Sequence, residues 1–87
     1  MRYIYTDSRL ICIDNISFME IEKDNIVLTL NSGRTLKAFK TYNETDLYLV
    51  FYELTKEIRR NEHDIDWYEF QCHMRYYHGV EDGTWFI

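Results

Sequence analysis

Four carboxylates surround a tryptophan in one short stretch of the chain. The residues of this stretch are Glu62, Asp64, Asp66, Trp67 and Glu69. A row of carboxylates attracts basic protein surfaces, and an exposed tryptophan often contributes much of the binding energy at an interface. If the following residues form a strand, Trp67 falls on its polar face and is exposed. We therefore predict a partner-binding site here, with a solvated acidic loop as the alternative.

A second acidic row precedes it in the chain. Glu20, Glu22 and Asp24 are spaced two residues apart, so a strand would place all three on one face. The favoured interpretation is an ordinary outer face, or protection of a sheet edge against unwanted pairing. We keep the row as a second candidate for partner binding.

Histidine and cysteine residues near the C-terminal end suggest metal or thiol chemistry. They are Cys72, His73 and His78, with His63 earlier. Zinc sites usually show short spacings between ligands, such as two cysteines separated by two residues, and none occurs here. On a strand, Cys72 and His73 would point to opposite faces and could not share an ion. We therefore expect no metal ligands, catalytic residues or cofactor, and keep a small metal- or thiol-dependent enzyme as the rival hypothesis.

Charge is distributed unevenly along the 87 residues, whose net charge is −5. Residues 1–42 carry six Lys and Arg against five Asp and Glu, whereas residues 43–87 carry four against ten. Duplex nucleic acid requires clustered basic residues, and the densest cluster is the pair Arg59-Arg60. The charge pattern argues against direct nucleic-acid binding and favours a partner protein with a basic surface.

The chain lacks the patterns of membrane insertion and export. Its longest apolar run, residues 47–52, is much shorter than a membrane span, and the first residues do not resemble a signal peptide. We expect a cytoplasmic protein that does not bind membranes. Cys12 and Cys72 are then expected to be reduced thiols that pack as small apolar side chains. Nothing in the sequence indicates an oligomeric state.

The first half of the chain is dominated by strand patterns. No proline or linker divides it, so we predict one domain over residues 1–87. Residues 3–5 and 10–13 predict a hairpin, and residues 16–22 predict a strand with one wet face. Residues 26–30 and 34–41 predict a second hairpin around Asn31-Ser32-Gly33. In that hairpin Leu28 faces Leu36 and Ile26 faces Ala38.

A helix is predicted over residues 43–61. Asn43 is a favourable N-cap, and Arg59 and Arg60 lie in the last turn, where the helix dipole favours cations. Apolar residues recur at helical spacing along one face: Leu47, Val50, Phe51, Leu54 and Ile58. We expect this face to pack on the sheet.

Residues 67–77 fit two patterns. As a strand, apolar and polar residues alternate without exception from Tyr68 to Tyr76. As a helix, Trp67, Phe70 and Met74 form a stripe with Tyr77, but other apolar residues then lie on the far side. The alternation favours a strand that forms a terminal hairpin with residues 84–87. The expected fold class is therefore α+β, an antiparallel meander of four to five strands with one packed amphipathic helix and a C-terminal β-hairpin.

The composition of the chain also suggests a class of proteins. A small acidic α+β domain, rich in Ile, Asn, Lys and Tyr and without proline, resembles in size and composition the small inhibitors that phages of low-GC bacteria use against host defence, including anti-CRISPR proteins. The resemblance implies a non-enzymatic nucleic-acid mimic, acting in the host cytoplasm, whose carboxylates replace phosphates on a basic surface. We expect a stoichiometric inhibitor or adaptor, with a housekeeping interaction domain that has no defence role as the alternative.

Overall fold

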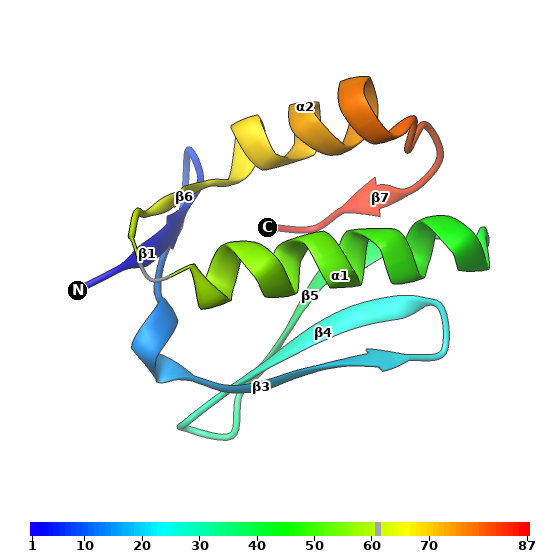
Figure 1. Cartoon of the computed structure of the whole chain (residues 1–87). Coiled ribbons are helices and arrows are strands. Elements are labelled where there is room, and N and C mark those ends of the chain that lie inside the picture. Colours follow the sequence, from blue (N-terminus) through cyan, green and yellow to red (C-terminus); the bar gives the residue numbers. More distant parts are fainter. Residues whose placement is uncertain (61) are drawn as a thin grey trace.

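The computed structural model describes residues 1–60 and 62–87 and confirms the α+β class (Figure 1). The elements in chain order are β1 (Tyr3–Tyr5), β2 (Leu10–Cys12), a short 3-10 helix η1 (Ile13–Asn15), β3 (Ile16–Glu22), β4 (Asn25–Leu30), β5 (Thr35–Lys40), α1 (Glu44–Arg59), β6 (Ile65–Asp66), α2 (Trp67–His78) and β7 (Thr84–Trp85). Within the described residues no helix is long and apolar enough to cross a bilayer.

The larger sheet has the strand order β3-β4-β5-β7, and all its pairs are antiparallel. The predicted turn between β4 and β5 is confirmed: Gly33 has a φ of 90°, and Leu28 lies opposite Leu36. The predicted pairing of Ile26 with Ala38 is wrong, because an irregularity in the register places Ile26 opposite Phe39. Ala38 is the extra residue of this bulge, and both Ala38 and Phe39 are fully buried.

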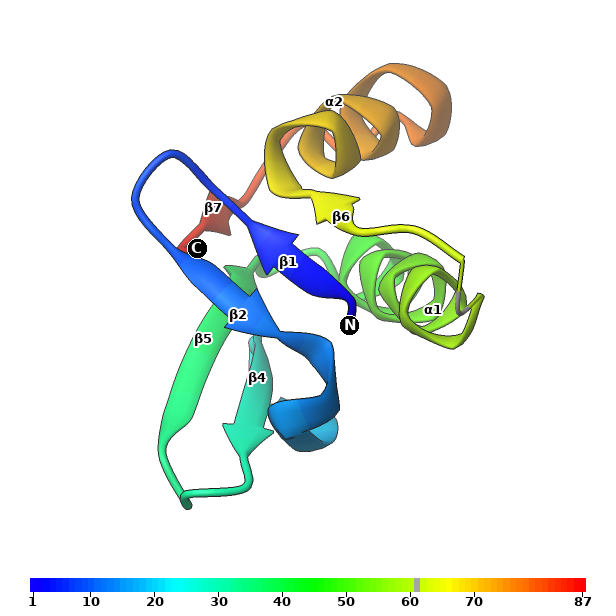
Figure 2. The ribbon, with the colours of Figure 1, turned by 90° about the vertical axis from the view of Figure 1, so that its left-hand side faces the viewer.

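The smaller sheet corrects the prediction of a single meander. Strands β1 and β2 form the expected hairpin, but β1 also pairs in parallel with β6, giving the order β2-β1-β6. Figure 2 shows this hairpin crossing one end of the larger sheet, with β6 beside β1. The parallel pair joins residues about 61 positions apart, with Ile4 opposite Ile65 and Tyr5 opposite Asp66.

Helix α1 lies across the larger sheet, as predicted (Figure 1). The Asn43 side chain accepts a hydrogen bond from the Asp46 backbone N–H, and Leu47, Val50 and Leu54 are buried. Phe51 and Ile58 are only half-buried at the margin of the predicted stripe. The helix ends at Arg59, and residue 61, the last position predicted for it, lies outside the described residues.

The C-terminal end of α1 is held by a side chain from the N-terminal end of the protein. The Arg2 guanidinium donates to the backbone carbonyls of Ile58 and Glu57, at 2.7 and 2.8 Å. Its Nε donates to the His63 carbonyl at 2.9 Å. The last carbonyls of a helix have no partner within the helix, so Arg2 satisfies them and complements the dipole.

The strand predicted over residues 67–77 is wrong, because these residues form helix α2. The Asp66 side chain caps its N-terminus, and Glu69 occupies the third position of the helix, as in a capping box. At the other end Gly79 adopts a left-handed conformation with φ of 71°, and the N–H groups of Gly79 and Val80 both donate to the Met74 carbonyl, which caps the last turn. These two end signals and the buried stripe outweigh the alternating pattern. The predicted C-terminal hairpin is therefore absent, and β7 pairs with β5 instead.

One hydrophobic cluster joins both sheets and both helices. Its aromatic part stacks Trp67 on Phe70, with the edge of Trp85 against Trp67 and the ring of Phe39 against Trp85. The cluster consists of Ile4, Ile11, Ile13, Ile26, Leu28, Leu36, Ala38, Phe39, Leu47, Val50, Leu54, Ile65, Trp67, Phe70, Met74 and Val80. The turn before β7 approaches this cluster so closely that a Cβ at Gly83 would lie 2.5 Å from the Phe39 ring.

Candidate functional site

Trp67 is buried, so its predicted role as an exposed binding anchor is wrong. Its side chain is 1% exposed, with ring centroids 5.3 Å from Phe70 and 5.7 Å from Trp85. As the first residue of α2, it points into the core, whereas a strand would have presented it to solvent. The candidate site is therefore the acidic surface around α2, without the tryptophan.

Two of the four predicted carboxylates organise the backbone. Oδ1 of Asp66 accepts hydrogen bonds from the backbone N–H groups of Tyr68 and Glu69, at 3.1 and 3.3 Å. Oδ1 of Asp64 accepts from the Tyr3 backbone N–H at 2.9 Å. Asp66 thus starts α2, and Asp64 ties the edge of β1 to the segment that precedes β6.

Asp66 also interacts with a tyrosine of β1. The phenol of Tyr5 donates to Oδ2 of Asp66 at 3.3 Å. Partial desolvation, the negative charge of Asp66 and this hydrogen bond raise the pKa of Tyr5, because each disfavours the phenolate. Tyr5 remains a neutral hydrogen-bond donor beside the acidic surface at neutral pH.

Three of the four predicted carboxylates line a groove between the end of α1 and the start of α2. The groove is lined by Glu57, Arg60, Asp64, Ile65, Asp66, Glu69, Phe70 and His73. The structure thus brings Asp64, Asp66 and Glu69 together, as the sequence predicted, and adds Glu57 from another helix. Glu62 does not line the groove, and its carboxylate lies 3.9 Å from Nε2 of the exposed His63.

The second acidic row shares its surface with lysines. Glu20 and Glu22 lie on the exposed face of β3, an edge strand, but Asp24 lies in the turn after it, next to Lys23 with φ of 57°. The register from β3 to β5 places Lys37 on the same face as Glu20, and Lys40 on the same face as Glu22. Carboxylates and ammonium groups therefore share this surface. Edge protection, the favoured interpretation of the row, fits its position in the sheet.

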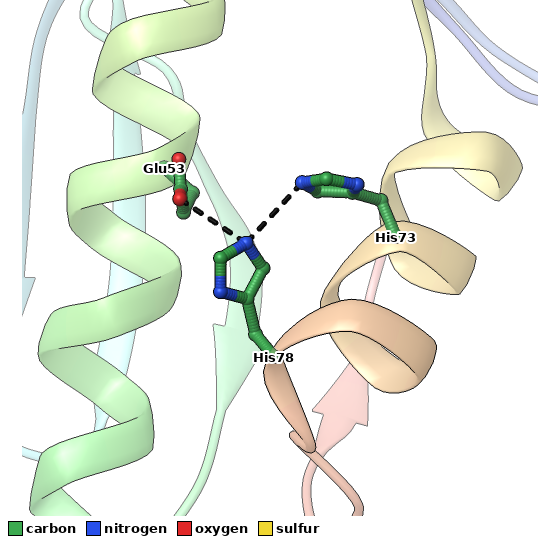
Figure 3. Close-up of side chains that lie close together, drawn as sticks. All are labelled: Glu53, His73 and His78. Carbon is green, nitrogen blue, oxygen red and sulfur yellow. Dashed lines mark hydrogen bonds and ion pairs between the residues drawn. The ribbon is translucent and has the colours of Figure 1, made fainter.

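Helix α2 also brings two histidines close to a carboxylate of α1. Nε2 of His78 lies 3.2 Å from Oε1 of Glu53 in α1 and 3.3 Å from Nε2 of His73 (Figure 3). The strand at 67–77 that placed Cys72 and His73 on opposite faces is wrong, whereas the expectation of no metal ligands stays a prediction. Among the described residues this cluster is formed by Glu53, His73 and His78, without Cys72 or His63.

The two thiols lie outside this cluster. Cys12 and Cys72 are free and half-buried rather than fully packed in the core. Interaction with the Cys72 side chain raises the pKa of the Tyr68 phenol, one turn away on α2. Neither cysteine is placed to act with a histidine of the Glu53 cluster.

Sequence reasoning missed Glu57 and Glu53. Both lie in α1, off the apolar stripe, where acidic residues are ordinarily solvated. Each acquires its neighbours from α2, so no spacing within α1 marks it. Comparisons with protein-family models, with curated proteins and with solved structures find no match. Function is therefore argued from these two groups of side chains.

Proposed function

We propose that the protein is a non-enzymatic binding module whose acidic groove receives a basic segment of a partner protein. The convergence of Glu57, Asp64, Asp66 and Glu69 on one groove is the observation that supports this proposal. These carboxylates come from α1, from the segment that leads into β6, from β6 itself and from α2, so folding gathers negative charge that the sequence distributes over 13 positions.

The groove suits an arginine or lysine side chain. Planar guanidinium groups pair with carboxylates through two parallel hydrogen bonds. Ile65 and Phe70, which are buried, contribute an apolar floor on which the methylene stem of such a side chain would pack. Polar walls above an apolar floor favour a long cationic side chain over a simple ion.

The groove retains negative charge when its own cation is counted. Arg60 lies 3.4 Å from Oε1 of Glu57, but this pair is at the surface, with the Arg60 side chain 65% exposed. Exposed pairs contribute about 0–1 kcal/mol, so a partner's guanidinium can displace Arg60 at little cost. An inhibitor or adaptor that occupies a basic, nucleic-acid-binding surface would use the groove in this way. A housekeeping interaction domain is the alternative with the same chemistry.

A synthetic peptide of nine arginines, labelled with a fluorophore, tests the groove directly. Its affinity is measured by fluorescence anisotropy for the native chain and for the double variant Glu57→Gln, Glu69→Gln. Within the described residues, the one hydrogen bond or ion pair that these two side chains make is the surface pair of Glu57 with Arg60. Losing two exposed charge pairs should weaken binding by about fivefold, equivalent to about 1 kcal/mol.

The matched control is the double variant Glu20→Gln, Glu22→Gln, which changes the net charge equally on the far sheet face. It should weaken binding less than twofold. Equal weakening by both double variants would mean that net charge, and not the groove, attracts the peptide, and would contradict the proposal. Affinity should also fall between low and physiological salt, because exposed charges are screened over about 8–10 Å.

The partner itself is sought with the same variants. The native chain and the Glu57→Gln, Glu69→Gln variant are used as bait in lysate of the native host. A partner that the native chain retains and the groove variant loses supports the proposal. A partner retained equally by both variants would move the binding surface away from the groove.

A further inference from the structure

Three side chains of metal-binding type meet between the two helices. Glu53 comes from the middle of α1, and His73 and His78 come from the second half of α2. Figure 3 shows the three side chains pointing toward one another across the gap between the helices. We propose that Glu53, His73 and His78 form a zinc-binding site, which shares only His73 with the lining of the acidic groove.

The distances between the candidate ligand atoms fit one small cation. Zinc bound to nitrogen and oxygen at about 2.0–2.1 Å in tetrahedral geometry holds its ligand atoms about 3.3–3.4 Å apart. Nε2 of His78 is 3.2 Å from Oε1 of Glu53 and 3.3 Å from Nε2 of His73. All three ligand atoms lie within 4.8 Å of one another. Small side-chain rotations would therefore complete the geometry.

Hydrogen bonding among these three side chains serves only part of this arrangement. Nε2 of His78 faces a carboxylate oxygen and a second ring nitrogen at nearly equal distances. If it carries a proton, one N–H group must serve two acceptors. If it does not, its lone pair faces the Glu53 carboxylate. A cation bound among the three atoms would accept a lone pair from each of them.

The backbone fixes where the two histidines lie. His78 is the last residue of α2, and the left-handed Gly79 turns the chain away directly after it. The ring of His73 packs against Tyr77, with centroids 5.2 Å apart. Although the two histidines are five positions apart, which is not a usual ligand spacing, the helix end allows the His78 ring to reach back toward His73.

The ligand set selects the metal. Two imidazoles and one carboxylate suit zinc and its first-row neighbours, whereas magnesium and calcium prefer oxygen ligands throughout. Three protein ligands leave the fourth tetrahedral position to water. Nζ of Lys56 lies 3.3 Å from the other oxygen of Glu53, Oε2, so Oε1 remains available for the metal. Lys56 is itself about half exposed, and solvent therefore screens its charge.

Calorimetric titration of metal-stripped protein with zinc sulfate tests the site. We expect one zinc ion per chain, and cobalt in its place should give the visible absorption bands of a tetrahedral nitrogen and oxygen site. The variants His73→Ala and His78→Ala, and separately Glu53→Gln, should each weaken zinc binding at least about tenfold, because loss of even a supporting residue costs 10–100-fold.

The control is His63→Ala, which removes a histidine outside the cluster and should leave zinc affinity unchanged. Both cysteines are replaced by serine in every chain tested, so that thiol ligands do not contribute. Circular dichroism confirms that each variant is folded. Absence of zinc binding by a folded chain would overturn the proposal, as would equal affinity of the cysteine-free parent chain and its His73→Ala and His78→Ala variants.

Discussion

Replacing Trp67 with alanine should destabilise the protein strongly. The side chain is 1% exposed and packs against both Phe70 and Trp85, so its removal leaves a large cavity in the aromatic part of the core. Truncating a buried tryptophan to alanine costs about 3–5 kcal/mol. Domains of this length are stable by roughly 4–13 kcal/mol, at about 0.05–0.15 kcal/mol per residue. The substitution therefore removes a large share of the folding free energy.

A graded variant separates ring packing from hydrogen bonding at this position. The buried indole Nε1 of Trp67 has no hydrogen-bond partner within the described chain. Trp67→Phe loses part of the ring but also removes this unsatisfied donor, which itself costs about 1–3 kcal/mol when buried. We expect Trp67→Phe to cost about 1–2 kcal/mol, clearly less than Trp67→Ala.

Urea unfolding followed by far-ultraviolet circular dichroism measures these differences. The control is Tyr68→Ala, because Tyr68 is the next residue of α2 and is 72% exposed. It should change the free energy of unfolding by no more than about 0.5 kcal/mol. Equal stability losses for Trp67→Ala and Tyr68→Ala would refute the buried position of Trp67 and would restore it as an exposed anchor.

Three further predictions concern the cap of α2, the glycine in the turn before β7 and the phenol of Tyr5. In the same urea assay, Asp66→Ala should lower the free energy of unfolding by about 1–2 kcal/mol, because it removes the N-cap of α2. Asp66→Asn retains a capping oxygen and should lower it much less. Equal losses would mean that charge rather than capping matters. Gly83→Ala should lower the melting temperature, because its Cβ would lie 2.5 Å from the Phe39 ring at a φ of 146°. In Gly33→Ala the added Cβ meets nothing within 4 Å, so this variant should lose less stability. The reverse order would contradict the close packing at Gly83. The raised pKa of Tyr5 means that the folded state holds the phenolic proton more tightly than the unfolded state, so stability should be fully present below the ordinary tyrosine range and fall as pH rises through it; Tyr5→Phe should make this alkaline decline shallower, and an unchanged decline would exclude Tyr5 as its source.

Local patterns predicted the elements whose partners lie nearby in the chain. The turn at Asn31-Ser32-Gly33 set the register of β4 with β5 around Leu28, and the apolar stripe with Asn43 placed α1. In both cases turn chemistry, capping and periodicity agree. The bulge at Ala38 escaped prediction because it serves the packing of Phe39, which depends on the distant β7.

Conflicting local signals explain the error at residues 67–77. The alternation of apolar and polar residues favoured a strand, although Tyr68 and Tyr76, which that strand would place on its apolar face, are exposed. The spacing of Asp66 to Glu69 and the glycine at position 79 are helix-end signals, and they identify α2 correctly. Weighing these ends above the alternation would have placed Trp67 in the core.

The candidate sites depend on contacts that the sequence does not display. Glu57 reaches the acidic groove, and Glu53 reaches the two histidines, only because α1 and α2 lie side by side (Figures 1 and 2). The predicted carboxylates at positions 64, 66 and 69 were recognised from charge density alone. Only the folded chain shows which of these carboxylates accept hydrogen bonds from backbone N–H groups and which do not.

The most direct test of the acidic groove is a map of peptide binding on isotope-labelled protein. Backbone amide shifts in two-dimensional NMR spectra are followed while the peptide of nine arginines is added at low salt. The groove predicts that the largest changes occur at Glu57, from Asp64 to Glu69 and at His73, and that they diminish in the Glu57→Gln, Glu69→Gln variant. Largest changes along β3 at Glu20 and Glu22, or small changes spread over the whole surface, would contradict it.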